Sequence, residues 1–234
     1  MNKRMTMTLS PSPLDFSDVC AALGRGDRVA LFIRHSERPP IRPDDKDFGR
    51  HLGLTPRGVA LAREAGARLT GAPPDARFLA SPMQRCRLTA RHVAEGMGIS
   101  APRVEDADPL GVRGFFYRDP YAVQEIMRQQ GYMAYMLEYL KTGNAPHSAP
   151  LADATEQTLE WMITQMTVPF VLFVSHDIFV AAILTGLRLR SYTAEAWVGF
   201  LHGFALVRHG QDPWACHPCL PSHAAVGAPH PFIH

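Results

Sequence analysis

Apolar and polar positions follow one another along the chain in blocks that predict strands and helices in alternation. Three short runs, RVALFIRH, ARFLASP and VPFVLFVSH, are almost wholly apolar until their last residues. Such runs are typical of buried strands in a parallel sheet. They occupy residues 28–35, 76–82 and 168–176, and HGFALVRH at 202–209 is a fourth candidate strand.

Helical patterns follow the first three of these strands. Thr55 suits an N-cap and Pro56 a first turn, and apolar residues then recur at helical spacing until Gly71. The segments MQRCRLTARHVAEGMG and DIFVAAILTGL are helical in the same way. Strands and helices that alternate at this spacing predict an α/β fold, with a doubly wound, mainly parallel sheet flanked by helices.

Two stretches depart from this alternation. Residues 106–150 are rich in Tyr, Phe, Gly and Pro, and they contain one amphipathic helix or a pair, so we expect a small inserted cap over one end of the sheet. Residues 213–234 carry five prolines, four histidines and no Lys, Arg, Asp or Glu. We therefore expect a single domain at 1–212 and a carboxyl-terminal extension that builds no core of its own.

Composition excludes several classes of function. The chain has 234 residues and a net charge of only +2, which argues against nucleic acid or an anionic membrane as a partner. No apolar run approaches the roughly 20 residues of a membrane span. The start, residues 1–13, lacks the apolar stretch of a secretory signal, which favours a cytoplasmic protein, or it is a frayed end. Four unevenly spaced cysteines make no disulfide framework, and one C-x-x-C at 216–219 is a weak metal signal.

Polar side chains that suit an anion follow each of three predicted strands: Arg34, His35 and Arg38, then Ser81 and Arg85, then Ser175, His176 and Asp177. Functional groups of a doubly wound sheet lie just beyond the carboxyl ends of its strands. Arginine forks match phosphate oxygens, so three arginines and one histidine would balance a phosphate monoester. The other histidine, kept neutral by the guanidinium groups, would be free to act as a nucleophile. Asp177, beside a bound dianion, would hold a proton for a leaving oxygen.

Four motifs occur in order between residues 30 and 210: RHSER with a proline two positions later, LTPRG, SPMQRCRLTA and LFVSHD. Together they resemble the histidine phosphatase superfamily, also called the phosphoglycerate-mutase-like fold. Its signatures include R-H-G-x-R, L-T-x-x-G and S-P-x-x-R-x-x-x-T-A. Pro40 extends the first motif as in the acid-phosphatase branch of that superfamily.

The resemblance implies roles for individual residues. His35 would be the nucleophile that becomes phosphohistidine. The phosphate would be bound by Arg34, Arg38, Arg85 and His176. The mutase-like branch takes its proton donor from a glutamate in L-x-E, and Val112 occupies that place here. The acid-phosphatase branch uses the aspartate of an H-D pair, which implies Asp177, with Glu105, Asp106 and Asp108 as alternatives.

Two further candidates remain beside this set. Ser36 stands where the superfamily usually has glycine, and its hydroxyl could donate to phosphate if the position needs no positive φ. Arg113 would contact a larger anionic substrate or form an exposed ion pair. We expect the aromatic residues of 106–150 either to line a substrate pocket or to fill the core of that segment.

The sequence thus predicts a phosphatase that hydrolyses phosphate monoesters through a phosphohistidine and needs no metal or other cofactor. The alternatives are a phosphomutase of the same superfamily and a catalytically inactive protein that binds a phosphorylated ligand. The expected partner is a small phosphorylated substrate or phosphate. The identity of that substrate, the role of the extension and the oligomeric state are left open by the sequence.

Overall fold

The structure, a computed structural model, describes residues 7–42, 45, 49–71 and 75–221. Within these residues the helices and strands are, in chain order, β1 (Met7–Leu9), α1 (Phe16–Gly24), β2 (Arg28–Arg34), α2 (Pro56–Ala67), β3 (Ala76–Ala80), α3 (Gln84–Gly96), β4 (Val104–Asp106), the 3-10 helix η1 (Asp108–Leu110), α4 (Pro120–Gln130), α5 (Tyr132–Thr142), α6 (Leu151–Thr164), β5 (Phe170–Ser175), α7 (Asp177–Gly186), β6 (Gly203–Arg208) and β7 (Trp214–Cys219).

The strands of the described residues form one sheet in the order β1-β7-β6-β2-β5-β3-β4. Strands β2, β5, β3 and β4 are mutually parallel, and β7 is parallel to β1. Only β6 runs the other way, antiparallel to both β2 and β7. This is the α/β fold with a mainly parallel sheet that the sequence predicted.

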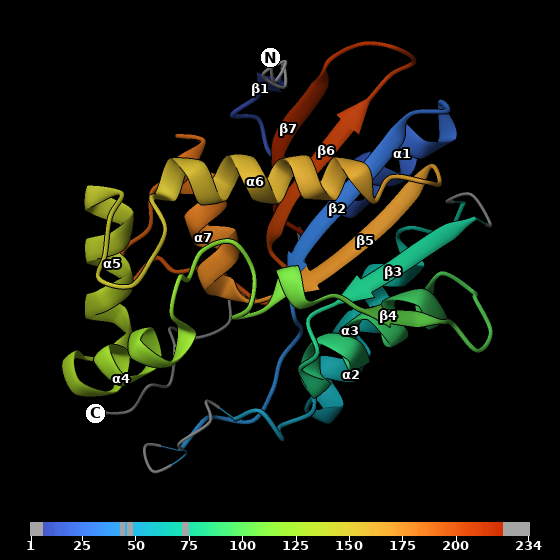
Figure 1. Cartoon of the computed structure of the whole chain (residues 1–234). Coiled ribbons are helices and arrows are strands. Elements are labelled where there is room, and N and C mark those ends of the chain that lie inside the picture. The colour runs from blue at the N-terminus through green and yellow to red at the C-terminus, as the bar shows by residue number, and fades with distance from the viewer. Residues whose placement is uncertain (1–6, 43–44, 46–48, 72–74, 222–234) are drawn as a thin grey trace.

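Helices cover both faces of the sheet (Figure 1). Alternate residues of β2 point to opposite faces, as the pleat of a strand requires. Val29 and Leu31 pack in a core with α1, α2 and α3, whereas Ala30 and Phe32 pack in a second core with α5, α6 and α7. Burial on both faces explains why the central strands read as continuous apolar runs.

The segment predicted as a cap, residues 106–150, begins at the last residue of β4 and contains η1, α4 and α5. Its helical part is a pair of helices, because Gly131 has a φ of 92° and ends α4 just before α5 begins. In Figure 1 both helices lie beyond the carboxyl ends of β2 and β5. The Ser175 hydroxyl, at the end of β5, donates to the carbonyl of Leu110 at 2.6 Å and ties η1 to the sheet.

The expectation of an extension that starts at residue 213 is wrong for its first part. Trp214–Cys219 form β7, which lies between β6 and β1 in the sheet. The segment contributes to the core because Trp214 and Cys216 alternate inward and are buried, which a proline-rich composition conceals. The remainder of that extension, residues 222–234, lies outside the described residues.

The start of the chain is also part of the sheet, because Met7–Leu9 form β1 and pair with β7. The reading of this start as a frayed end is therefore wrong for these three residues; residues 1–6 lie outside the described part of the chain. Across the described residues, no helix combines the length and apolarity that crossing a membrane requires.

Candidate active site

Three strand ends meet at one edge of the sheet. In the ladders Arg34 is level with Ser175, and Ala80 is level with Val174. The pairing continues one step further, because the backbone N–H of His35 donates to the Ser175 carbonyl at 2.9 Å. A cavity of about 320 Å³ opens at this edge, and its lining includes residues that follow β2, β3 and β5.

The loop after β2 is fastened by the two helices that carry the LTPRG and SPMQRCRLTA motifs. The hydroxyl of Ser36 donates to the Gly58 carbonyl at 2.7 Å, and its backbone N–H donates to the Thr89 hydroxyl at 2.9 Å. Any Cβ on Gly58 would lie 2.1 Å from the Glu37 carbonyl oxygen, so only glycine lets α2 approach this loop. These motif residues therefore hold the loop and are not part of the cavity lining.

His35 is buried and its ring orientation is fixed. Its Nδ1 lies 2.7 Å from the carbonyl of Ser36, which can only accept, so Nδ1 carries the proton and Nε2 keeps its lone pair. Burial, followed by the charges of Arg85 and Arg34, holds the pKa of His35 well below its usual value. The ring lines the cavity as a neutral, oriented imidazole.

His176 lies beside His35, with the ring centroids 5.6 Å apart in an edge arrangement. Its Nε2 is 3.0 Å from the hydroxyl of Ser81, and the buried thiol of Cys86 is 3.7 Å away. Burial and the charge of Arg85 lower the pKa of His176 well below its usual value. Burial also raises the pKa of Cys86 to about 12, so this thiol stays protonated and is not a nucleophile.

Arg38 and Arg85 line the cavity and repel each other. Burial, reinforced by the charge of Arg85, lowers the pKa of Arg38 to about 10, and burial lowers that of Arg85. Each guanidinium donates once to a nearby carbonyl, Arg38 to Pro39 and Arg85 to Gly49, both at 2.8 Å. The Nε of each has no partner in the described residues. A buried and a half-buried cation with unused donors are a site for an anion.

Arg34 does not line the cavity. It stands behind it, with its guanidinium carbon 4.2 Å from the centroid of the Phe200 ring and a hydrogen bond to the Val198 carbonyl. Its Nη2 lies 3.4 Å from Oδ2 of Asp177. Arg34 therefore supports Asp177 and adds positive charge behind the cavity lining, and its direct contact with phosphate stays a prediction.

Asp177, the first residue of α7, is buried and accepts from several donors. Its Oδ1 accepts from the Tyr132 hydroxyl at 3.1 Å and from the Ile178 backbone N–H at 2.9 Å. Its Oδ2 accepts from the Trp197 indole at 3.2 Å in addition to the Arg34 contact. The side chain lines the same cavity as His35, as its place beside His176 predicted.

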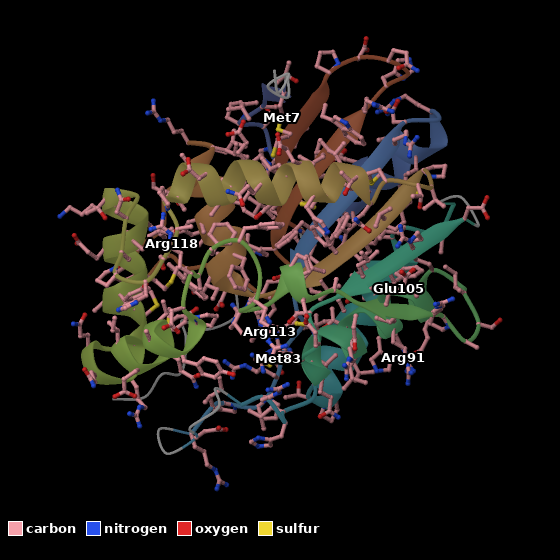
Figure 2. All side chains as sticks on the ribbon, viewed as in Figure 1. Met7, Met83, Arg91, Glu105, Arg113 and Arg118 are labelled. Carbon is pink, nitrogen blue, oxygen red and sulfur yellow. The ribbon has the colours of Figure 1, made fainter. Side chains whose placement is uncertain are left out.

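The structure separates the remaining candidates. Glu105 and Asp106 form ion pairs with Arg77 and Arg87 and are not part of the cavity lining, whereas Asp108 is. In Figure 2 Glu105 lies out along β4, away from the labelled Met83 and Arg113.

Of the two further candidates, Arg113 is exposed and lines the cavity. Ser36 does not line it, and its φ is not positive, which is why serine replaces glycine there without strain.

Several residues of the site gave no sequence signal. Trp197 and Phe200 come from the loop between α7 and β6, and Ile41 and Arg50 come from the loop between β2 and α2. No motif or periodicity marks these positions. The aromatic residues of the cap serve both predicted roles. Phe116 and Tyr135 are buried in the core, Tyr121 and Tyr132 line the cavity, and Tyr117 is buried and also lines the cavity. Among the described residues no group of three or more His, Cys, Asp or Glu side chains could hold a metal ion.

Comparisons with known proteins agree with this arrangement. Residues 30–109 match the family model described as "Histidine phosphatase superfamily (branch 1)". No curated protein sequence matches the chain. Among solved structures, the native mycobacterial glucosyl-3-phosphoglycerate phosphatase has a TM-score of 0.53 and 18% identity, and the alignment covers 83% of this chain and 98% of that one.

Two other solved structures are similar to the same degree. A complex of the same mycobacterial phosphatase with inorganic phosphate has a TM-score of 0.52 and 18% identity, covering 83% of this chain and 96% of that one. A protein described as mycobacterial hydrolase 1 has a TM-score of 0.53 and 16% identity, covering 83% and 98%. At such low sequence identity, the similarity to these structures shows a shared fold and nothing about a shared activity.

Proposed function

We propose that this chain belongs to the histidine phosphatase superfamily and hydrolyses phosphate monoesters through a phosphohistidine on His35, which its match to the family model over residues 30–109 and its fold support. One observation carries the proposal. A buried imidazole with its Nε2 lone pair free lines a cavity together with two guanidinium groups that have unused donors. A nucleophile beside uncompensated positive charge suits attack on an anionic phosphorus centre.

The first step is an in-line displacement at phosphorus. Nε2 of His35 forms a bond to phosphorus while the bond from phosphorus to the ester oxygen breaks, and the electron pair of that bond leaves with the oxygen. Arg38, Arg85 and His176 surround the three equatorial oxygens, where hydrogen bonds from fixed donors stabilise the transition state most. Arg34 adds charge from behind. In this proposal the guanidinium groups supply the charge that a metal ion would otherwise provide.

The departing oxygen needs a proton, and we assign its transfer to Asp177. The phosphate dianion favours the protonated carboxyl form, while the Tyr132, Trp197 and Arg34 contacts favour the carboxylate. The Arg34 contact, at 3.4 Å, is the longest of these, and it is the one that a protonated Oδ2 would give up. Asp108 is the other carboxyl group that lines the cavity within the described residues, and it is the alternative donor.

The second step releases phosphate. A water molecule attacks phosphorus and gives one proton to the Asp177 carboxylate, while the bond from phosphorus to Nε2 of His35 breaks and its electron pair returns to the nitrogen. His35 thus returns to its neutral form with the Nδ1 proton still directed at Ser36. The proposed partner is a small phosphorylated molecule. The proposed location is the cytoplasm, which agrees with the free thiols of the four cysteines.

The test is hydrolysis of p-nitrophenyl phosphate and of alkyl phosphates by the wild type and by His35→Ala, with EDTA present throughout. We expect turnover by the wild type, a fall of at least about 10³-fold in the variant, and acid-labile phosphate on wild-type His35 after a rapid quench. The matched control is His51→Ala, since His51 is exposed and is not part of the cavity lining. Loss of wild-type activity in EDTA would contradict the proposal.

The two alternatives give different results in the same experiment. A phosphomutase would form phosphohistidine from a phosphorylated donor and pass the group to a second alcohol faster than to water. An inactive binding protein would bind vanadate or phosphate without labelling His35. Either result would replace hydrolysis as the function of the site.

A further inference from the structure

Much of the lining of the cavity that contains His35 is apolar. It is lined by the apolar side chains of Ile41, Met83, Val112, Tyr121, Val123 and Met127. These come from the loop after β2, the start of α3, the loop after η1 and helix α4. Figure 2 shows Met83 near Arg113 at this edge of the sheet, between α3 and the segment that leads to α4. The phosphate-binding residues and this apolar wall face one shared space.

The apolar wall reaches the surface. Among the described residues the large hydrophobic side chains that are exposed are Leu9, at 48%, Val112, at 46%, and Tyr121, at 78%. Two of these three lie at the cavity. Single exposed apolar side chains are common on protein surfaces, whereas several that lie together mark a binding surface.

Helix α4 keeps its charged groups off this wall. Glu125 accepts from Arg128 and, at 2.6 Å, from the amide of Gln129, and none of these three residues lines the cavity. Val123 and Met127, one turn apart, are buried and do line it. Among the described residues, the charged and amide side chains of the lining that lie outside the proposed phosphate site are Arg50, Asp108, Arg113 and Gln124. Ile41, Met83, Val112, Val123 and Met127 offer no hydrogen-bond partner, so the hydroxyl groups of a sugar placed against them would stay unpaired.

The size of the cavity leaves room for a leaving group. A cavity of about 150 Å³ is enough to bind benzene, and a phosphate with its five heavy atoms is no larger than that ring, so it takes up less than half of the space. The cavity volume is about 320 Å³, near the lower end of the range for small-molecule sites. The remaining space fits one ring or a short alkyl chain.

We propose that the substrate is the phosphate monoester of an apolar alcohol, with one ring or a short alkyl chain, seated between Met83 and helix α4. Turnover of such an ester rests on the proposed phosphatase function. Binding does not, because the apolar wall and the guanidinium groups would hold a phosphorylated apolar molecule whether or not it is hydrolysed.

Binding is tested with phosphonates, which cannot be hydrolysed. Calorimetric dissociation constants would be measured for methyl-, butyl-, hexyl- and phenylphosphonate and for the hydroxylated 2,3-dihydroxypropylphosphonate. We expect affinity to rise by up to about fourfold for each methylene group that becomes buried. The dihydroxypropyl compound should bind no better than methylphosphonate. Equal affinities along the alkyl series, or tighter binding of the hydroxylated compound, would overturn the proposal.

Variants locate the effect. Tyr121→Ala and Val112→Ser remove apolar surface at exposed positions, so neither should unfold the chain. We expect each variant to reduce the increase in affinity from butylphosphonate to hexylphosphonate, and to change the affinity for methylphosphonate by less than twofold. Leu9→Ser is the matched control, because Leu9 is equally exposed but lies in β1 and does not line the cavity. An equal effect of Leu9→Ser would also overturn the assignment.

Turnover separates this inference from the proposed function. Glycerol is a more acidic alcohol than butanol and therefore the better leaving group, so a higher kcat/KM for butyl phosphate reports binding and not the leaving group. We expect butyl phosphate to be preferred by at least tenfold. If phosphonates bind with the expected chain-length dependence and no ester is hydrolysed, the hydrolysis proposal fails and the apolar site stands. If both esters are hydrolysed equally well, the hydrolysis proposal stands and the apolar substrate is wrong.

Discussion

At the scale of single residues, burial and hydrogen bonding decide what each group of the site can do. His35 and His176 are adjacent buried imidazoles with lowered pKa values, yet their partners differ. A backbone carbonyl fixes the tautomer of His35, whereas the Ser81 hydroxyl faces His176. A carbonyl can only accept a hydrogen bond, so it leaves the opposite nitrogen of His35 with a lone pair for phosphorus.

The buried histidines predict a dependence of stability on pH. Burial holds the pKa of His35 and His176 well below 6.5 and lowers that of His202 to about 4. Below pH 6.5 the unfolded chain therefore binds more protons than the folded chain, so stability is complete above that pH and is lost as the pH falls. Each such histidine lowers the free energy of unfolding by up to about 1.4 kcal/mol per pH unit.

The measurement is urea unfolding between pH 7.5 and 5, in phosphate-free buffer. Carboxyl groups titrate mostly below this window, so the histidines dominate the change. His202→Asn should lose less stability than the wild type between pH 7 and pH 5. A wild-type free energy of unfolding that is the same at both pH values would contradict this account.

The proton donor is tested by Asp177→Asn with two kinds of ester. The amide keeps the shape of the side chain but cannot donate the carboxyl proton. We expect kcat for butyl phosphate to fall by about 10²- to 10⁴-fold, and kcat for p-nitrophenyl phosphate, whose leaving group needs no proton, to fall much less. Asp108→Asn is the matched comparison. If its profile is the selective one and that of Asp177→Asn is not, Asp108 is the donor.

At the scale of elements, three motifs act through the contacts between helices α2 and α3 and the loop after β2. Thr55 caps α2 and also donates to the Glu37 carboxylate at 2.7 Å, while Thr89 of α3 accepts from Ser36. The loop that carries Arg38 is therefore held from two sides before any ligand binds. Such preorganisation is what allows a site to stabilise charge without rearranging.

Gly58→Ala should break this arrangement. The new Cβ would lie 2.1 Å from the Glu37 carbonyl oxygen, so the helix or the loop must move. We expect a loss of about 1–3 kcal/mol in the free energy of unfolding and a marked loss of phosphate affinity, measured by urea unfolding and calorimetry. Gly24→Ala, in α1, is the control, because a Cβ there meets nothing within 4 Å. Similar behaviour of the two variants would show that the close approach does not matter.

At the scale of the whole molecule, the sheet extends on both sides of the strands that carry the site. Strands β6, β7 and β1 form one side, and β7 joins β1 to the rest of the sheet. Trp214 is buried and stacks with Arg208 of β6, whose guanidinium carbon is 4.9 Å from the centroid of the indole ring. The carboxyl-terminal strand is thus part of the core, although it is distant from the cavity.

Shortening the chain tests this role. A chain that ends at Asp212 lacks β7, so β1 loses its partner and β6 becomes an exposed edge. We expect it to be insoluble or to unfold without a cooperative transition, as measured by circular dichroism during heating. A chain that ends at residue 221 keeps every ladder of the described sheet and should unfold cooperatively. Cooperative unfolding of the shorter chain would contradict this role of β7.

The sequence by itself determined the central strands, the helices that follow them and the identity of the chemical groups, because these depend on local order. Apolar runs that end in Arg34, Ala80 and Ser175 mark the strands, and parallel strands bring their carboxyl ends together. It did not determine β1 and β4, which have three residues each, or β7, whose prolines and histidines hide its alternation. The pairing of all three depends on distant partners.

Only the tertiary structure decided which of these groups line the cavity. Arg34 follows the same strand as His35 but turns towards Phe200 and Asp177, and Trp197 reaches Asp177 from a loop without a motif. The apolar wall likewise combines Met83 with α4, which are distant in the chain. Sequence pattern reports which face of its own element a residue occupies. What that side chain meets depends on contacts between residues far apart in the sequence, and these form only when the chain folds.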